Sequence, residues 1–157
     1  MALSKNEIKN AYPLPVYNYR VEINGNAVAF SEVSGLSISY ETTTYKESPV
    51  EGSAPGPRVM YMPAQKAAAN ITLKKGVVRS SSLATLFSWI NSTQINQIDK
   101  KDIFIRLCDE KGAAVISWKV TNAFPTKLDA PTFDANANDA AIESMELMAD
   151  GIFIEAA

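Results

Sequence analysis

The sequence predicts a mainly β protein, built as an antiparallel two-sheet sandwich or barrel with one α-helix. Three observations predict this fold class. Apolar and polar residues alternate with a period of two along several segments, as they do in half-buried strands of antiparallel sheets. Turn-forming residues separate several of these segments. One segment instead has apolar residues at clear helical spacing.

The first predicted strands lie between residues 17 and 43. Residues 17–23 place tyrosine and β-branched side chains on one face, and this strand meets Asn24-Gly25, a strong hairpin turn signal. The returning arm, residues 28–33, alternates less clearly. The pattern resumes over residues 36–43. There the apolar face carries Leu36, Ile38 and Tyr40, and the polar face carries Ser37, Ser39, Glu41 and Thr43.

Three further strands are predicted in the rest of the chain. They include residues 71–73, 103–107 and 116–120, where apolar residues recur at every second position. The turn between the last two is Glu110-Lys111-Gly112.

The helix is predicted over residues 81–94. Three serines at residues 80–82 offer N-caps, and the apolar residues that follow lie three or four positions apart. Residues 141–152 are ambiguous, because Ile142, Met145 and Met148 also suit a helix. Periodicity alone favours a helix there.

Two segments are predicted to extend from this sheet structure. Residues 46–58 contain Pro49, Pro55 and Pro57, and proline lacks the N–H group that a strand inside a sheet must donate. This stretch therefore projects as a loop, which is either a mobile surface loop or a functional one. Residues 1–15 read as an extended N-terminal arm.

Composition limits the function classes. A chain of 157 residues with 46% hydrophobic residues fits one domain with a real core. A net charge of −2 gives no general attraction to nucleic acid or to an anionic membrane. The sequence contains no signal peptide and no stretch long enough to span a bilayer, so synthesis and assembly are expected in the cytoplasm.

The residue types and their spacing do not support a catalytic site or a metal site. The chain has no histidine, which rules out Ser-His and Cys-His nucleophile pairs and His-based zinc sites, and the single Cys108 reads as inert. Residues 134–138 resemble half a calcium loop, but Asp139 replaces the required glycine, so an Asn/Asp turn is favoured. Glu143 and Glu146 fall on opposite faces if their segment is a strand. No catalytic, cofactor-binding or metal-binding residue is predicted.

Three segments, in order along the chain, carry a resemblance to a known family. Residues 17–47 contain an opening hairpin and the turn FSEVSG, and residues 70–77 read NITLKKGV. Residues 118–151 pass from an aromatic strand ending in NAFP, through Pro131 and an Asn-rich turn, into AIESMEL. This order resembles the tail tube proteins of contractile phages and contractile injection systems, which are related to the ring protein of type VI secretion.

The resemblance implies an architecture and a set of partners. It implies that residues 141–152 are strand, and that six subunits close into a ring with a continuous inner β-barrel around a hollow channel. The rings would stack into a passive conduit that sheath contraction drives through a target envelope. The implied partners are other copies of the chain, a contractile sheath protein, baseplate and tail-terminator proteins, and cargo in the lumen. Specific nucleic-acid recognition and stable membrane insertion are not expected, and the implied location is a virion tail or an injection particle.

The resemblance also implies roles for individual residues. Interface residues of the loop are Glu47, Pro49, Val50, Pro55, Pro57 and Arg58. Interface residues of the N-terminal arm are Leu3, Tyr12 and Pro13. Lumen candidates are polar residues on alternating faces, namely Ser37, Ser39, Glu41, Thr43, Asn70, Thr72 and Lys74, although an ordinary solvent face fits the same alternation.

Two alternatives remain open at this stage. A monomeric β-sandwich module that binds carbohydrate through exposed Trp or Tyr side chains would share the alternation. Within the family, a specialised ring near the baseplate would share the motifs. A hydrolase is the least favoured class, because the chain has no histidine and no acid pair that the spacing supports.

Overall fold

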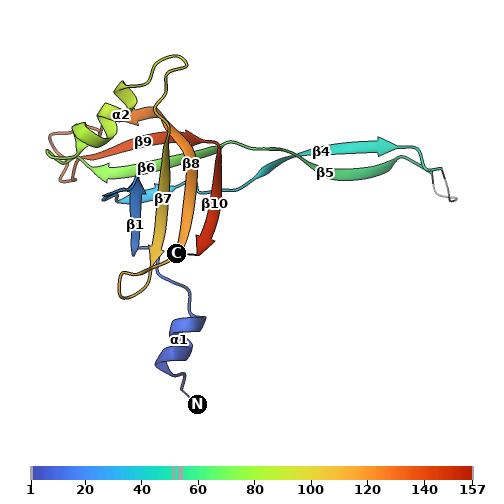
Figure 1. Cartoon of the computed structure of the whole chain (residues 1–157), viewed down its shortest axis with the longest axis horizontal. Helices are drawn as coiled ribbons and strands as arrows, with labels where there is room; N and C mark the ends of the chain where they lie inside the picture. The colour runs from blue at the N-terminus through green and yellow to red at the C-terminus, as the bar shows by residue number, and fades with distance from the viewer. Residues whose placement is uncertain (1, 51, 53–54, 157) are drawn as a thin grey trace.

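The computed structural model describes residues 2–50, 52 and 55–156. Within them, ten strands and three helical elements follow one another along the chain (Figure 1). The elements are α1 (Lys5–Ala11), β1 (Tyr19–Ile23), β2 (Asn26–Val28), β3 (Glu32–Ser34), β4 (Tyr40–Glu47), β5 (Arg58–Lys66), β6 (Ala69–Gly76), η1 (Ser82–Phe87), α2 (Ser88–Asn91), β7 (Lys101–Cys108), β8 (Ala114–Asp129), β9 (Ile142–Ala149) and β10 (Gly151–Ala156). The predicted mainly β, antiparallel fold is confirmed.

Eight strands form one continuous antiparallel sheet that bends into two layers. The strand order is β2-β1-β7-β8-β9-β6-β3, and β10 pairs with β8. The long strand β8 joins the layers, because its first half pairs with β7 and β10 while its second half pairs with β9. Register shifts interrupt the β7–β8 and β8–β9 ladders, and a bulge at Pro125 accommodates a proline within the strand.

The hydrophobic core lies between the two layers. Its centre is formed by Leu73 and Ile71 of β6, Met145 of β9 and Ile103 of β7, and all four are fully buried. The helical segment covers one end of this core with Leu86 and Trp89. The Trp89 indole N–H donates to the backbone oxygen of Asp99 at 2.7 Å, so the buried ring keeps its hydrogen bond. Trp89 is thus a core residue.

The predicted helix forms, but it is shorter and less regular than the spacing suggests. Residues 82–87 form a π-helical turn and residues 88–91 a short α-helix, so the helical segment covers 82–91 rather than 81–94. The prediction of one helix is also incomplete, because α1 is a second helical region.

The ambiguous segment 141–152 is strand, as the family resemblance implies. It forms β9 and the start of β10, and every second residue of β9 is buried against the core. Helical spacing arose here because Ile142 and Met148 are apolar residues on the exposed face.

Two strand predictions near the N-terminus are wrong in extent. Residues 28–33 are not one strand, because β2 ends at Val28 and β3 begins at Glu32. Residues 36–39 lie outside any strand, and β4 begins only at Tyr40. Tyr17 precedes β1 and is 82% exposed rather than half-buried. Gly35 marks the break, with φ of +87° and its Cα so near the backbone oxygen of Asn70 that any Cβ would clash.

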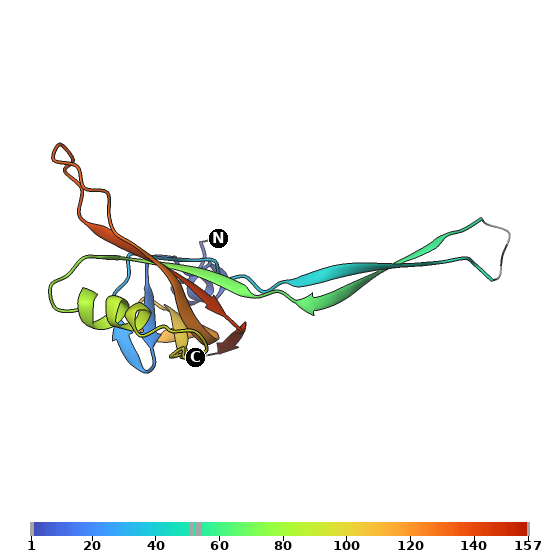
Figure 2. The same ribbon diagram turned by 90° about the horizontal axis from the view of Figure 1, so that it is seen from above.

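The remaining two strands leave the body altogether. β4 and β5 pair only with each other and project as a long hairpin from one side (Figures 1 and 2). The connection between β8 and β9 and the helical segment lie at the other end, and α1 hangs from a third side (Figures 1 and 2). No helix within residues 2–50, 52 and 55–156 is long and apolar enough to cross a membrane.

Candidate assembly surfaces

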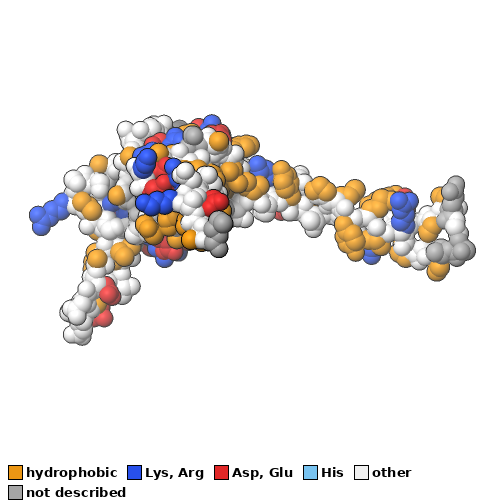
Figure 3. Space-filling model, turned by 90° about the horizontal axis from the view of Figure 1, so that it is seen from below, with side chains coloured by type: hydrophobic (Ala, Val, Ile, Leu, Met, Phe, Trp, Pro, Cys, Tyr) orange, Lys and Arg blue, Asp and Glu red, His pale blue; other side chains and the backbone are white. Residues whose placement is uncertain are grey.

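The β4–β5 hairpin carries apolar side chains that no other part of the subunit buries. Its cross-strand pairs include Tyr45 with Met60 and Thr44 with Tyr61, and no residue of either strand is buried. Figure 3 shows hydrophobic side chains along its length. A two-stranded hairpin is only marginally stable by itself in water, so its apolar surface calls for a partner.

The predicted interface residues of the loop lie at the outer end of this hairpin. Glu47 ends β4 and Arg58 begins β5, and their side chains form an ion pair at 3.9 Å. Exposed residues between them include Pro49, Val50, Pro55 and Pro57. Residues 51 and 53–54 of the predicted 46–58 loop lie outside the described residues. Paired strands reach further along the projection than the loop prediction assumed.

The N-terminal arm is not extended, because residues 5–11 form α1. Glu7 N donates to the Ser4 Oγ at 3.2 Å, and Ser4 N donates to the Glu7 carboxylate at 2.7 Å. This reciprocal pair is a capping box, and the hydrogen bond from the Ser4 backbone lowers the pKa of Glu7 below its ordinary value. The spacing Ser4-x-x-Glu7 marks the start of this helix in the sequence.

No residue of α1 is buried. The predicted arm residues Leu3, Tyr12 and Pro13 flank the helix; Leu3 and Tyr12 are exposed, and Pro13 is also exposed. The ion pair between Lys9 and Glu110, at 3.6 Å, links the helix to the turn between β7 and β8. Met1, the first residue of the predicted arm, lies outside the described residues.

A polar face lies on the outer side of β6 and β9. Along β6, the buried Ile71 and Leu73 alternate with the outward Asn70, Thr72 and Lys74. The register places Glu146 of β9 opposite Thr72, and Lys74 forms an ion pair with Glu32 of β3 at 3.2 Å. This polar face is defined as Glu32, Ser34, Asn70, Thr72, Lys74, Ser144 and Glu146.

The seven lumen candidates do not share one surface. Asn70, Thr72 and Lys74 belong to the polar face, whereas Glu41 and Thr43 lie on the projecting hairpin. Ser37 and Ser39 lie in the segment between β3 and β4, and the Ser39 backbone oxygen accepts a hydrogen bond from the Ala67 N–H at 3.0 Å. The alternation over 36–43 therefore does not mark a single strand face, although all four of these residues are exposed.

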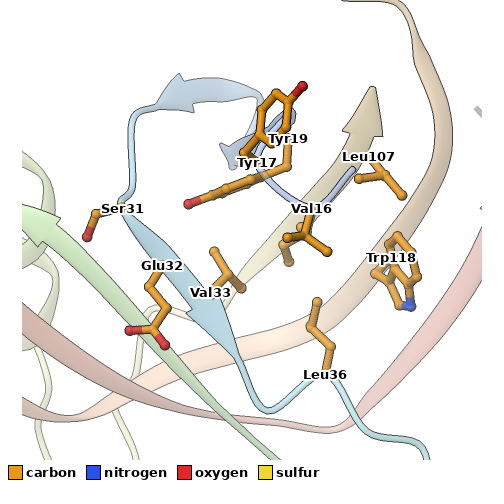
Figure 4. Close-up of a pocket in the computed structure, with 10 residues that line it drawn as sticks. Val16, Tyr17, Tyr19, Ser31, Glu32, Val33, Leu36, Leu107 and Trp118 are labelled. Carbon is orange, nitrogen blue, oxygen red and sulfur yellow. The ribbon is translucent and has the colours of Figure 1, made fainter. Parts of the chain in front are cut away.

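An open apolar groove runs between β3 on one side and β1, β7 and β8 on the other (Figure 4). It has a volume of about 550 Å³, and Val33, Leu36 and Trp118 line its wall. The Tyr19 hydroxyl donates a hydrogen bond to the Phe30 backbone oxygen at 2.7 Å. The pKa of Tyr19 is raised mainly by burial and, to a smaller extent, by the negative charge of the nearby Glu32 carboxylate. The groove lining is mainly apolar, so it offers few of the converging polar groups that a sugar site uses.

The residues that could carry chemistry are dispersed. Glu143 is buried and Glu146 exposed on the opposite face of β9, as predicted for a strand. Residues 134–137 form the predicted Asn/Asp turn, where the Asn136 N–H donates to the Asp134 carboxylate at 3.0 Å. In the part of the chain that the structure describes, no group of three His, Cys, Asp or Glu side chains is placed to hold a metal ion.

Comparison with known proteins places the chain in a family. The sequence matches the model for T4-like virus tail tube protein gp19 over residues 15–152. A search among curated proteins finds no match. Among solved structures, the chain is similar to a chain of the PVC sheath–tube complex of an extracellular contractile injection system in the extended state. That similarity has 41% identity and a TM-score of 0.88, and covers 99% of this chain and 100% of the other.

Two further solved structures are similar to this chain. A chain from the tube-terminating cap of the anti-feeding prophage is 40% identical with a TM-score of 0.85, and the match covers all of both chains. Hcp1 from Flavobacterium johnsoniae is 18% identical with a TM-score of 0.52, covering 90% of this chain and 97% of the other, which extends the likeness in fold alone. The chain therefore belongs to the family of T4-like tail tube proteins.

Proposed function

We propose that this chain is the inner-tube subunit of a contractile injection system, and that six copies close into a ring. The β4–β5 hairpin carries the proposal, because it extends a row of apolar side chains away from the body and buries none of its residues. Stacked rings would cover this surface. The sheath, tube terminator and baseplate are the proposed partners, since the matched chains come from a PVC sheath–tube complex and from PVC and anti-feeding prophage terminator structures, while a 21% identical chain from that prophage's baseplate shares the fold.

Ring and tube follow from two kinds of head-to-tail contact. Within the described residues, the body strands β2, β3 and β10 each pair on one side only, so their other edges can pair with another copy. If the rotation from one copy to the next brings the last copy back to the first, every edge is paired and the copies form a closed ring. The two faces of such a ring differ, so a second head-to-tail contact between rings does not close and grows a tube.

The polar face on β6 and β9 is the proposed lining of the channel. A channel wall must stay wet on one side while its other side packs on the protein, and β6 alternates in this way. The tube then acts as a rigid passive conduit for cargo while the sheath contracts. The proposed lumen residues are the predicted Asn70, Thr72 and Lys74, joined by Ser144 and Glu146.

Negative-stain electron microscopy of concentrated wild-type protein tests this function. Hollow rings or stacked tubes are expected. Featureless monomers at high concentration, also in the presence of a purified baseplate template, would contradict it and favour a monomeric binding module.

Deletion of residues 49–57 tests whether the tip of the hairpin is needed for tube growth and not for folding of the subunit. Because the deleted segment lies beyond the last cross-strand pair of the hairpin, Glu47 with Arg58, the body should keep its melting temperature. We expect rings that fail to elongate into tubes. Tubes of normal length from this variant would remove the hairpin from the ring-stacking contact.

The channel assignment is tested by labelling assembled tubes. Thr72→Cys and Asn70→Cys should react slowly with a maleimide too bulky to enter the channel, and quickly with a small one. The matched control is Lys111→Cys, because Lys111 is exposed in the turn between β7 and β8 and is not part of the polar face. Rapid reaction of Thr72→Cys with the bulky reagent would place the polar face outside the channel.

A further inference from the structure

The β4–β5 hairpin leaves the body at a base that no strand pairing ties to the body sheet. On the entering side, residues 36–39 lie outside any strand, and on the leaving side residues 67 and 68 separate β5 from β6. The Ala67 N–H donates to the Ser39 backbone oxygen at 3.0 Å, which joins the two arms of the hairpin to each other. β4 and β5 likewise pair only with each other (Figures 1 and 2). The direction of the hairpin must therefore be set by other contacts at its base.

One side chain at this base reaches the body. Lys66 is the last residue of β5, and its ammonium nitrogen lies 4.8 Å from the centre of the Phe153 ring on β10. A lysine ammonium within about 6 Å of a ring centre is attracted by the negative face of the aromatic ring. Lys66 thus joins β5 to β10 by a cation–π contact, although these two strands share no ladder.

The backbone of β10 leaves room for this ammonium group at Gly151. A Cβ placed on Gly151 would lie 3.1 Å from Lys66 Nζ and 3.9 Å from the Phe153 ring. Gly151 does not have the left-handed backbone conformation that favours glycine at other positions. The absence of a side chain at this position therefore serves the close approach of Lys66.

Phe153 belongs to a row of side chains across the outer face of the body sheet. The register places Phe153 beside Lys119 of β8, and Lys119 beside Phe104 of β7. The centre of the Phe104 ring lies 5.7 Å from Lys119 Nζ and 4.7 Å from the guanidinium carbon of Arg106. Cations and aromatic rings thus alternate across β7, β8 and β10, and Lys66 continues this row onto the hairpin.

We propose that Lys66 is a positioning residue, which sets the direction of the hairpin by holding the base of β5 against Phe153. The contact restrains a hinge formed by residues 36–39 and 67–68, and it does so without burying any part of the hairpin. This positioning is a property of the single subunit. Only its consequence for tube growth rests on the proposed function.

Distances between two spin labels in one subunit test this role. The labelling sites are exposed lysines, Lys46→Cys on β4 and Lys111→Cys in the turn between β7 and β8, in a Cys108→Ala background. An excess of unlabelled protein restricts double electron–electron resonance to distances within one subunit. We expect a narrow distance distribution with Lys66 present. Lys66→Met keeps the length of the side chain but removes its charge, and should widen the distribution about twofold.

Three further variants isolate the cation–π contact. Lys66→Arg keeps a cation over the ring and should restore the narrow distribution, whereas Phe153→Leu removes the ring and should widen the distribution as Lys66→Met does. The matched control is Lys101→Met. Lys101 Nζ lies 5.0 Å from the Trp89 ring centre, which is a contact of the same kind away from the hairpin, so its loss should leave the distribution unchanged.

The outcomes distinguish this inference from the proposed function. A Lys66→Met distribution as narrow as that with Lys66, or a Lys66→Arg distribution as wide as that of Lys66→Met, would overturn the positioning role and leave the tube function intact. A wider distribution for Lys66→Met in a protein that forms neither rings nor tubes would support the positioning role and contradict the proposed function.

Tube growth gives a second readout of the same contact. A hairpin that is already held in one direction loses less conformational freedom when it meets another copy, so we expect Lys66→Met to elongate about threefold more slowly in light-scattering assays. Lys66→Arg should elongate at the wild-type rate, and so should the control Lys101→Met. The Lys66 side chain is exposed, so both Lys66 variants should keep the wild-type melting temperature as free subunits. Equal elongation rates for Lys66→Met and wild type would overturn the role of Lys66 in assembly.

Discussion

The body and the β4–β5 hairpin are built from the same antiparallel pairing but differ in what they bury. In β6 of the body every second side chain is inaccessible, and Ile71 and Leu73 reach the centre of the core. In the hairpin no side chain is buried on either face, although Tyr45 and Tyr61 expose large aromatic rings. Contacts within the subunit therefore account for the sequence of the body. They leave the apolar side chains of the hairpin uncovered, and only the proposed contacts with other copies would cover them.

Gly35→Ala should produce the largest effect, and the effect should fall on the body. The backbone at Gly35 has φ of +87°, and an added Cβ would collide with the backbone oxygen of Asn70, which cannot rotate away. We expect the variant to lose several kcal/mol of unfolding free energy, roughly 3 or more, or to fail to fold. Urea denaturation measures this loss.

Gly25→Ala is the matched control for this substitution. Gly25 has nearly the same φ, +86°, but its Cβ would meet nothing within 4 Å. Both variants share the left-handed strain of about 1 kcal/mol, so their difference isolates the clash. Equal losses in the two variants would show that β3 can move away from β6.

A second pair of substitutions contrasts the two regions directly. Leu73→Ala opens a cavity in the fully buried core and should cost about 2–5 kcal/mol of unfolding free energy. Tyr45→Ala removes a larger side chain from the hairpin but should change the unfolding free energy of the free subunit by no more than about 0.5 kcal/mol. The same variant should assemble poorly in sedimentation assays. If Tyr45→Ala destabilised the free subunit as Leu73→Ala does, the hairpin would have a packing role in the body.

Period-two alternation also explains how far the sequence could predict the structure. It located β1, β6, β7 and much of β8, because each has one face in the core. It failed at residues 36–39, where apolar and polar residues alternate without any strand pairing. It also could not separate β4 from a body strand, because alternation records side-chain type and not the presence of a covering layer.

The assembly surfaces show the same limit. The prolines between 49 and 57 correctly excluded a strand inside a sheet, but the length of the projection depends on the β4–β5 pairing, which is not encoded at those prolines. By contrast, α1 was encoded locally by Ser4 and Glu7, so it could have been found from the sequence.

Ser4→Ala should have a smaller effect, confined to α1. The substitution removes the capping box, which typically stabilises a helix by about 1 kcal/mol. A seven-residue helix with no buried residue is marginal in water, so we expect residues 5–11 to lose helical chemical shifts in NMR spectra. The melting temperature of the body should not change. Ser80→Ala is the control, because Ser80 is an exposed serine whose side chain forms no hydrogen bond within the described residues. A lower body melting temperature for Ser4→Ala alone would mean that α1 packs on the body in solution.

The smallest expected effect concerns the turn between β7 and β8, which the Asp109 side chain stabilises through hydrogen bonds from the turn's own backbone. The Asp109 carboxylate accepts hydrogen bonds from the Ala113 and Lys111 N–H groups, both at 2.9 Å, and these bonds lower its pKa below the ordinary 3.8. A group with a lowered folded-state pKa stabilises the fold above its unfolded-state pKa, and that contribution disappears as pH falls through the folded-state value. Wild type should therefore exceed Asp109→Asn in melting temperature at neutral pH, and the difference should shrink below about pH 4. Asp139→Asn, at an exposed carboxylate that accepts no hydrogen bond from the described residues, should show no such trend.

Because Asp109 lies on the turn that contacts α1 through Glu110 and Lys9, removing α1 provides a further check. If the pH dependence survives that removal, the turn belongs to the self-sufficient body rather than to the elements that need a partner.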